Sequence, residues 1–161
     1  MGDGERLIVG WREWVALPEL GLPAVKVKVD TGARTSAIHA FDIERVAAEE
    51  GVEQVAFSVH PLQRERGIVR RCRAPLVDRR RVTDSGGHAE ERFFVTTELH
   101  LGGRVRRIEL TLTQRHDMLF RMLLGRTALL PDVRVDPARS FLCGRVAARG
   151  LYSRTHQEPS R

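Results

Sequence analysis

The sequence predicts a mainly β fold that closes as a barrel or a sandwich, and three observations support this. Stretches in which polar and apolar residues alternate, such as residues 24–29 and 105–113, indicate strands with one buried face. Turn signals rich in glycine, proline and aspartate separate the stretches. At 161 residues the chain is also long enough for one domain with an ordinary hydrophobic core.

The strands expected in the N-terminal half combine alternation with bulky or small apolar residues. They are residues 7–17, 24–29, 36–41, 42–46 and 52–59. Prolines and glycine turn the chain at residues 18–23, and residues 49–51 join the last two strands. Ala47 and Ala48 also permit a helix there, and this alternative stays open.

The C-terminal half continues the same pattern. Its expected strands are residues 68–82, 92–101, 105–113, 118–124, 133–135 and 140–143. Residues 83–88 form the tip of a flexible hairpin, and Pro131 ends a short helix expected at residues 125–130. We expect one domain over residues 1–150, followed by a tail, residues 151–161, without regular structure.

Composition limits the function classes. The net charge is +6 and the pI is near 10.5, and only Lys26 and Lys28 are lysines, so arginine supplies most of the positive charge. Arginine pairs with carboxylates and phosphates, so acidic peptides, nucleic acid and phosphorylated ligands are candidate partners, and a solvated basic surface is the plain alternative. Aromatic residues total only 6%, which makes nucleic acid the weaker candidate.

Three absences shape the expected cellular setting. Cys72 and Cys143 lack metal-ligand spacing, and no secretory leader opens the sequence. No apolar run is long enough to span a bilayer. We therefore expect a reduced, cytoplasmic protein without a membrane segment.

The strongest candidate for chemistry is Asp30, which follows the alternating strand 24–29 and precedes Thr31, Gly32 and Ala33. A carboxylate at a strand exit, held by a tight turn, suits activation of water. Such chemistry needs a second carboxyl group, because two close carboxyls share one proton and act as base and acid. Asp117 and Asp132 lack a following Thr-Gly or Ser-Gly, so neither is expected to be this partner. The plain alternative is an Asp that caps its own turn.

These residues carry a family resemblance. Asp30-Thr31-Gly32-Ala33, Ser36-Ala37-Ile38, the glycine-containing hairpin and Leu123-Leu124-Gly125-Arg126 resemble the retropepsin-like aspartic peptidases over most of residues 20–130. Residues 29–40, with the arginines at 79–81, look like the bacterial family labelled "ATP-dependent zinc protease", whose members are associated with ATP-grasp peptide ligases.

The resemblance implies a retropepsin-like (acid protease) closed β-barrel with one short C-terminal helix, assembled as a two-fold homodimer. It implies that Asp30 is the catalytic carboxylate, that Thr31 supports it across the dimer axis, and that Gly32 allows close backbone approach. Ala33, Arg34 and Thr35 would then line the substrate groove. Ser85, Gly86 and Gly87 would form a flap over the substrate.

The family label itself does not fit the residues. The chain has no His-Glu-x-x-His and no Walker-type glycine loop, so we expect no metal and no cofactor. In the retroviral members an acidic residue stands where this chain has Arg34, and it pairs with the arginine that matches Arg126. Arg126 therefore needs another partner, and a groove with Arg34 beside it would favour glutamate-rich peptides.

Three functional hypotheses follow. The first is a dimeric aspartic peptidase that acts on acidic or ligase-made peptides. The second is a non-catalytic retropepsin-like module that binds a partner in an ATP-grasp ligase system. The third, favoured only by the pI, is a basic module associated with RNA or ribosomes.

Overall fold

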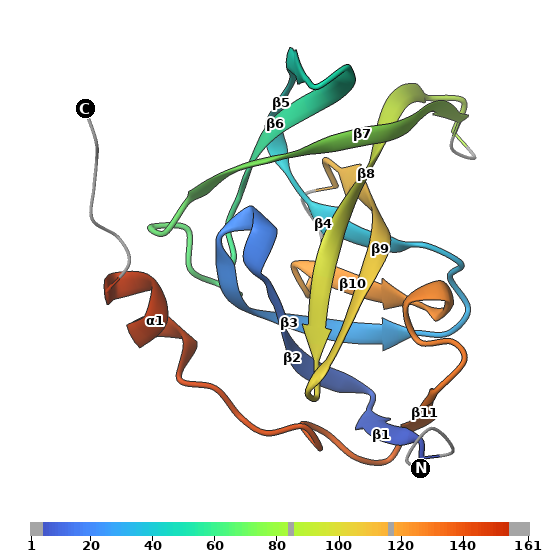
Figure 1. The fold of residues 1–161 in the computed structure, drawn as a ribbon, viewed down its shortest axis with the longest axis vertical. Coiled ribbons are helices and arrows are strands. Elements are labelled where there is room, and N and C mark those ends of the chain that lie inside the picture. Colours follow the sequence, from blue (N-terminus) through green and yellow to red (C-terminus); the bar gives the residue numbers. More distant parts are fainter. Residues whose placement is uncertain (1–4, 84–85, 116–117, 155–161) are drawn as a thin grey trace.

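The computed structural model describes residues 5–83, 86–115 and 118–154, and these residues form a predominantly β structure (Figure 1). The strands are β1 (Leu7–Gly10), β2 (Arg12–Leu17), β3 (Leu22–Asp30), β4 (Ser36–His39), β5 (Phe41–Glu49), β6 (Val52–Val59), β7 (Arg70–Thr83), β8 (Ala89–Leu101), β9 (Arg104–Thr113), β10 (Met122–Gly125) and β11 (Val133–Asp136). The helical elements are the 3-10 turns η2 (Pro18–Leu20) and η3 (Arg126–Ala128) and the α-helix α1 (Ala148–Arg154).

A closed barrel forms the centre of the molecule. Among the described residues the main sheet runs in the order β2-β3-β10-β4-β9-β8-β7-β6-β5. An additional pairing of β2 with β8, between Ala16 and His100, joins β2, β3, β10, β4, β9 and β8 into a ring. The sequence prediction of a mainly β, retropepsin-like closed barrel is therefore confirmed.

Two smaller parts flank the barrel. The hairpin of β5 and β6 extends the sheet through β7 and projects from the barrel at the top of Figure 1. At the opposite end, β1 and β11 pair in parallel as a separate two-stranded sheet. Strand β10 lies between β3 and β4, and this placement determines the geometry of the site described below.

Alternation in the sequence explains which side chains fill the barrel. On β3, Val25, Val27 and Val29 are buried, whereas Lys26, Lys28 and Asp30 keep some exposure on the other face. The same period buries Ile108, Leu110 and Leu112 on β9. The pattern that predicted the strands thus also fixes which face of β3 carries the charged residues.

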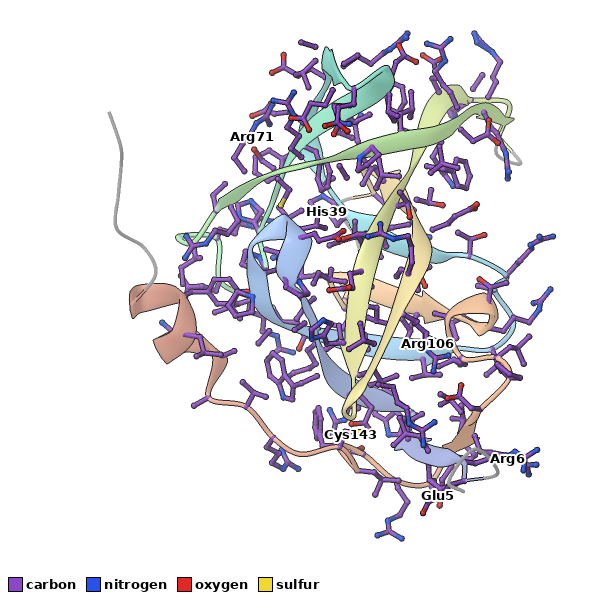
Figure 2. All side chains as sticks on the ribbon, viewed as in Figure 1. Glu5, Arg6, His39, Arg71, Arg106 and Cys143 are labelled. Atoms are coloured by element: carbon purple, nitrogen blue, oxygen red, sulfur yellow. The ribbon has the colours of Figure 1, made fainter. Side chains whose placement is uncertain are left out.

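The C-terminal segment (residues 137–147) runs along the base of the molecule to α1 (Figure 1). Glu13, which is fully buried, accepts hydrogen bonds from the backbone N–H groups of Gly10 (2.7 Å), Leu142 (2.9 Å) and Cys143 (3.0 Å). Figure 2 shows Cys143 in this segment, beneath the barrel. One buried carboxylate therefore fastens the segment to the start of β2.

Helix α1 packs on β3 through Tyr152, which is fully buried. Its hydroxyl donates to the Ala24 carbonyl oxygen at 2.7 Å and lies 3.3 Å from the Ala24 backbone nitrogen, which donates to it. Helix α1 therefore continues through residue 154, into the first part of the segment 151–161 that was expected to lack regular structure. Residues 155–161, the rest of the expected tail, lie outside the described residues.

Other details differ from the sequence prediction. The first strand is split at Trp11, because its backbone N–H donates to Arg139 and its carbonyl accepts from Val29, so the chain passes from one sheet to the other. Residues 140–143 are not a strand, because Glu13 takes two of their N–H groups and Phe141 has a left-handed φ of 55°.

Two expected helices also need correction. The helix expected at residues 125–130 is only the single 3-10 turn η3, and the short α-helix near the C-terminus is α1 instead. Ala47 and Ala48 lie in β5, so the helical alternative there is wrong. No helix in the described residues is long and apolar enough to cross a membrane.

Candidate active site

Asp30 is the last residue of β3, and the turn after it holds its carboxyl group in place. Its Oδ1 accepts a hydrogen bond from the Gly32 N–H at 3.1 Å, and its carbonyl oxygen accepts one from the Ala33 N–H at 3.1 Å. Alternation along β3 turns Asp30 away from the core, and its side chain is half-buried. The carboxyl group is thus held by one backbone donor, in a turn closed by a second, and is still reachable from solvent.

Strand β10 braces this turn from the side. Gly125 pairs in register with Asp30, and its N–H donates to the Ser36 hydroxyl at 3.0 Å. A Cβ at position 125 would lie 2.6 Å from the Thr35 carbonyl carbon, so only glycine allows the two backbones to approach this closely. The Leu-Leu-Gly-Arg motif therefore acts as a support for the Asp30 turn.

Arg126 and Thr127 complete the support by binding the carbonyl groups of the turn. The Arg126 N–H donates to the Ala33 oxygen at 2.8 Å, and the Thr127 hydroxyl donates to the Arg34 oxygen at 2.7 Å. The Arg126 guanidinium reaches the carbonyl oxygens of Thr31 (3.4 Å) and Gly32 (3.3 Å). In this chain the arginine of the motif therefore binds backbone oxygens of its own turn, where the resemblance had left its partner open.

The residues predicted to line a groove are placed as follows. Arg34 is exposed, and Ala33 and Thr35 are half-buried. Since the carbonyl oxygens of Ala33 and Arg34 accept bonds from η3, they are already used within the fold. Any contact of these residues with a ligand would come from their side chains or N–H groups.

The predicted flap corresponds to the β7–β8 hairpin. The two strands of this hairpin stay paired as far as Thr83 and Ala89. Gly86 and Gly87 are exposed in the turn, and Gly87 has a left-handed φ of 87° that favours glycine. Ser85, the third predicted flap residue, lies outside the described residues.

A cavity of about 260 Å³ lies on the Asp30 face of β3, and the sequence analysis did not identify it. Lys28 lines it and is two residues before Asp30, so the two side chains emerge on the same face; Leu123 is the register partner of Lys28 on β10. The full lining is Trp11, Lys28, Arg115, Met118, Leu119, Phe120 and Leu123. The alternation of Lys26, Lys28 and Asp30 was the available signal for its charged wall.

The cavity combines apolar walls with two cations. Trp11 and Phe120 meet edge to face, with ring centroids 5.9 Å apart, and Leu119 and Leu123 add aliphatic surface. Lys28 and Arg115 supply positive charge. Such a lining suits a side chain with an aliphatic stem and a carboxylate end.

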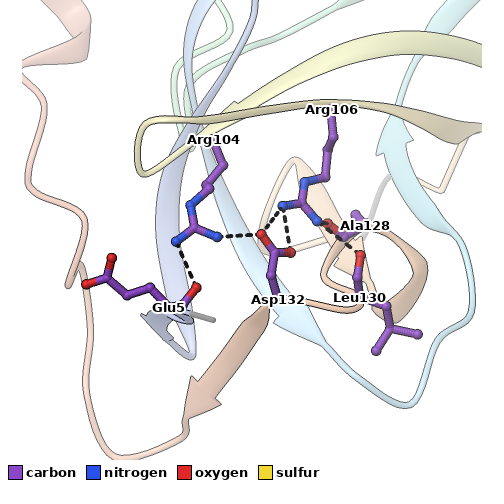
Figure 3. Close-up of polar contacts among 6 residues, drawn as sticks. All are labelled: Glu5, Arg104, Arg106, Ala128, Leu130 and Asp132. Carbon is purple, nitrogen blue, oxygen red and sulfur yellow. Dashed lines mark hydrogen bonds and ion pairs between the residues drawn. The ribbon is translucent and has the colours of Figure 1, made fainter. Parts of the chain in front are cut away.

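Asp132, one of the two aspartates considered as a second catalytic carboxyl group within the chain, pairs with arginines instead. It forms ion pairs with Arg104 and, at 2.8 Å, with Arg106 (Figure 3). The hydrogen bond from Arg106 is the largest cause that holds the pKa of Asp132 below its usual value; desolvation opposes it, and the hydrogen bond from Arg104 lowers the pKa further. Asp117 lies outside the described residues.

Within the described ranges no hydrogen bond joins Asp30 to another carboxyl group, and no group of three or more His, Cys, Asp or Glu side chains is arranged to hold a metal ion. His39 is buried near Phe41, and Phe41 stacks on His60 with ring centroids 4.8 Å apart. Desolvation lowers the pKa of His60. These histidines belong to an aromatic stack.

Comparison with known proteins gives one family, two longer relatives and one solved structure. A family model described as "RimB-like: Retropepsin-like aspartic endopeptidase RimB" matches residues 8–145. A protein of Shewanella pealeana named "Probable alpha-L-glutamate ligase" is 47% identical over 139 residues, which cover 86% of this chain and 30% of that protein. A Desulfotalea psychrophila protein of the same name is 43% identical over 159 residues, 99% of this chain and 34% of that protein.

The chain thus spans about a third of the length of these curated relatives. A crystal structure of a Legionella pneumophila protein of unknown function superposes with a TM-score of 0.71 and 28% identity, over 85% of this chain and 98% of that one. The fold of this chain therefore has a counterpart in a solved structure of similar length, and its sequence is similar to a segment of longer proteins.

Proposed function

Because this chain belongs to the family of RimB-like, retropepsin-like aspartic endopeptidases, we propose that it hydrolyses peptide bonds with a water molecule activated by Asp30. The observation that carries the proposal is the Asp30 turn. A half-exposed carboxyl group is held by the Gly32 N–H, and the turn is supported by Gly125 of β10 and by Arg126 of η3. Such fixation places a base where a peptide carbonyl can approach it.

The second carboxyl group would come from a second copy of the chain. In a two-fold dimer the same turn faces itself across the axis, so two Asp30 side chains meet and share one proton. The ionised Asp30 takes a proton from water as the water oxygen attacks the carbonyl carbon. The protonated Asp30 donates to the carbonyl oxygen, and collapse of the tetrahedral intermediate breaks the C–N bond as the nitrogen is protonated.

The charges around the site support an acidic peptide as substrate. Lys28 and Arg115 line the cavity on the Asp30 face, and Arg34 is exposed beside the turn. A cation at the end of an apolar pocket suits a glutamate side chain better than a neutral one. In this proposal Ala33, Arg34 and Thr35 contact the peptide from below, and the flap with Ser85, Gly86 and Gly87 covers it from above.

The names and lengths of the relatives support a peptide made by a ligase. Those proteins carry a segment similar to this chain within a molecule named as an alpha-L-glutamate ligase, so we propose that this chain acts on glutamate-containing products of such an enzyme. Cys72 and Cys143 are both free, which agrees with the proposed cytoplasmic setting.

The proposal is tested with the full chain and synthetic glutamate peptides, with products identified by mass spectrometry. Asp30→Asn should lower kcat by about 10²–10⁴-fold, the usual contribution of a general acid or base. Asp42→Asn, an exposed aspartate on β5, is the matched control and should keep activity. Turnover by purified Asp30→Asn at the wild-type rate would refute the role of Asp30.

The dimer is tested separately by sedimentation during turnover. Activity should fall with dilution as the dimer dissociates, because a monomer holds only one Asp30. A protein that is monomeric and fully active at assay concentration would refute the shared-carboxyl mechanism.

A second candidate function is a non-catalytic module that binds a glutamate ligase, and the length and names of the relatives favour it. This function predicts tight binding to such a ligase by wild-type protein and by Asp30→Asn alike. It also predicts no peptide cleavage by either protein.

A further inference from the structure

Phe141 stands at the centre of a group of cations on the outer face of β2 and β3. The guanidinium carbons of Arg145 and Arg12 lie 4.6 Å and 4.9 Å from the centroid of its ring, and the Lys26 amino nitrogen lies 5.8 Å from it. We name Arg12, Lys26, Phe141 and Arg145 the Phe141 cluster. Three cations around one ring form a concentrated positive surface.

The cluster lacks the carboxylates that accompany other arginines of the protein. In the part of the chain that the structure describes, none of its three cations forms an ion pair with an acidic residue, and the Arg12 Nε donates to the Ser140 hydroxyl at 3.1 Å. By contrast, Arg71 pairs with Glu44 at 2.9 Å, and Arg107 pairs with Glu19 at 2.7 Å. The fold therefore leaves positive charge uncompensated at this place.

Electrostatics at Lys26 agree with this description. Partial burial lowers the pKa of Lys26, and the neighbouring charges of Arg12, Arg145 and Arg64 lower it further. Like charges held this close repel one another, and a bound anion would relieve the repulsion.

The backbone places Phe141 in the cluster at a conformational cost. A φ of 55° is unusual for a bulky residue. Its N–H donates to the Arg12 carbonyl at 3.0 Å, and Glu13 binds the next two N–H groups of the segment. Strained residues held by their surroundings are concentrated at ligand sites, so the strain is a second pointer to binding.

The cluster continues the surface of the candidate active site. Lys26, Lys28 and Asp30 emerge on the same face of β3, and at about 3.3 Å per residue Lys26 lies about 13 Å from Asp30. Arg12 is the register partner of Lys28 on β2, and its guanidinium lies over Trp11, which lines the cavity on the same face. A single extended ligand of about four residues spans the distance.

We propose that the Phe141 cluster is a second carboxylate-binding subsite, which holds an acidic side chain of a peptide about four residues away from the peptide bond at Asp30. The inference rests on the proposed function, because the peptide is the one bound at Asp30. A nucleic-acid ligand is disfavoured because Arg12 and Arg145 lie over the Phe141 ring, which leaves less of it free for stacking on a base.

Fluorescence anisotropy with labelled triglutamate and octaglutamate tests the subsite. The full chain with Asp30→Asn is used, so that binding is measured without turnover. Lys26→Gln and Arg145→Gln should each raise the Kd for octaglutamate roughly tenfold, the effect of one charge-assisted contact. The Kd for triglutamate, which cannot span the two places, should change less than about twofold.

Arg45→Gln is the matched control, because it removes the same charge from the exposed hairpin of β5 and β6. An equal loss of octaglutamate binding in this control, or equal losses for both peptides in the cluster variants, would show a diffuse charge effect and overturn the proposal. Failure of octaglutamate to bind, or tighter binding of a single-stranded RNA octamer at the cluster, would overturn it as well.

These experiments distinguish failure of the proposed subsite from failure of the proposed peptidase activity. Hydrolysis of octaglutamate by wild-type protein, with unchanged KM in Lys26→Gln and Arg145→Gln, would reject the subsite and keep the peptidase. Binding that depends on peptide length and on the cluster, without hydrolysis, would keep the subsite and reject the peptidase.

Discussion

Glu13→Gln tests how the C-terminal segment is held, because a single side-chain carboxylate makes the connection. Glu13 is fully buried, and its two oxygens accept three backbone N–H groups, from Gly10, Leu142 and Cys143. Glutamine has the same shape but offers one acceptor oxygen and one NH2 donor. At least one buried N–H must therefore face another donor.

The expected loss follows from the hydrogen bonds. A hydrogen bond to a charged group contributes about 1.5–3 kcal/mol, and a buried unpaired N–H costs about 1–3 kcal/mol. Burying a neutral amide costs less than burying a carboxylate, which offsets part of this loss. We expect the free energy of unfolding to fall by about 2–3 kcal/mol, which lowers Tm by roughly 4–12 °C for a domain of this size.

Urea unfolding and thermal scans measure the loss, with Glu109→Gln on the exposed face of β9 as the control, expected within about 0.5 kcal/mol of wild type. Thiol labelling adds a site-specific readout. Burial and then the neighbouring Glu13 raise the pKa of Cys143 to about 11, so Glu13→Gln should speed its alkylation at pH 9. Unchanged stability together with unchanged labelling would show that Glu13 does not hold the segment.

Three further predictions concern other parts of the fold. Gly125→Ala should cost about 1–3 kcal/mol and reduce any Asp30-dependent activity, because the new Cβ would lie 2.6 Å from the Thr35 backbone. Gly150→Ala in α1 is the control, because its new Cβ would enter open space and should stabilise the protein by up to about 1 kcal/mol. Urea unfolding compares the stability of the two variants. Tyr152→Phe should cost about 1–3 kcal/mol, since both backbone groups of Ala24 lose their hydroxyl partner, and a neutral result would show that the Tyr152 hydroxyl does not stabilise the fold. The pKa of Asp132 is lowered in the folded state, so its ion pairs stabilise the protein above the unfolded pKa of about 3.9, and this stabilisation is lost as pH falls through the lower folded pKa. The difference in unfolding free energy between wild type and Asp132→Asn should therefore shrink below about pH 4. A constant difference down to pH 2 would contradict this.

Local pattern was sufficient for the strands and for the position of the candidate carboxylate. Alternation identified β3 and β9, and the turn signal after Val29 placed Asp30 at a strand exit. Where the prediction failed, a distant contact decided the local structure. Residues 140–143 have the composition of a strand, but their N–H groups bind the carboxylate of Glu13, about 130 positions earlier in the chain.

The candidate site likewise has parts that the sequence predicted and parts that depend on distant contacts. The sequence identified Asp30 and the Leu-Leu-Gly-Arg motif, and the resemblance related them. How Arg126 is used was not predictable, because its partners are backbone oxygens of the Asp30 turn, and any residue type offers such oxygens. The cavity was missed for a related reason, since Trp11, Lys28 and Phe120 become neighbours only after β2, β3 and the approach to β10 pack together.

The sequence by itself determined which side chains of each strand face the core, because side-chain direction in a strand alternates residue by residue and burial follows polarity. The tertiary structure alone decided that β10 supports the Asp30 turn, that Glu13 holds the C-terminal segment and that three cations surround Phe141. Apart from the contact of Arg145 with the nearby Phe141, these contacts join residues about 90 to 130 positions apart, and the local sequence pattern around one residue does not reveal its distant partner. They form only once the barrel has closed and the C-terminal segment has packed against β2 and β3.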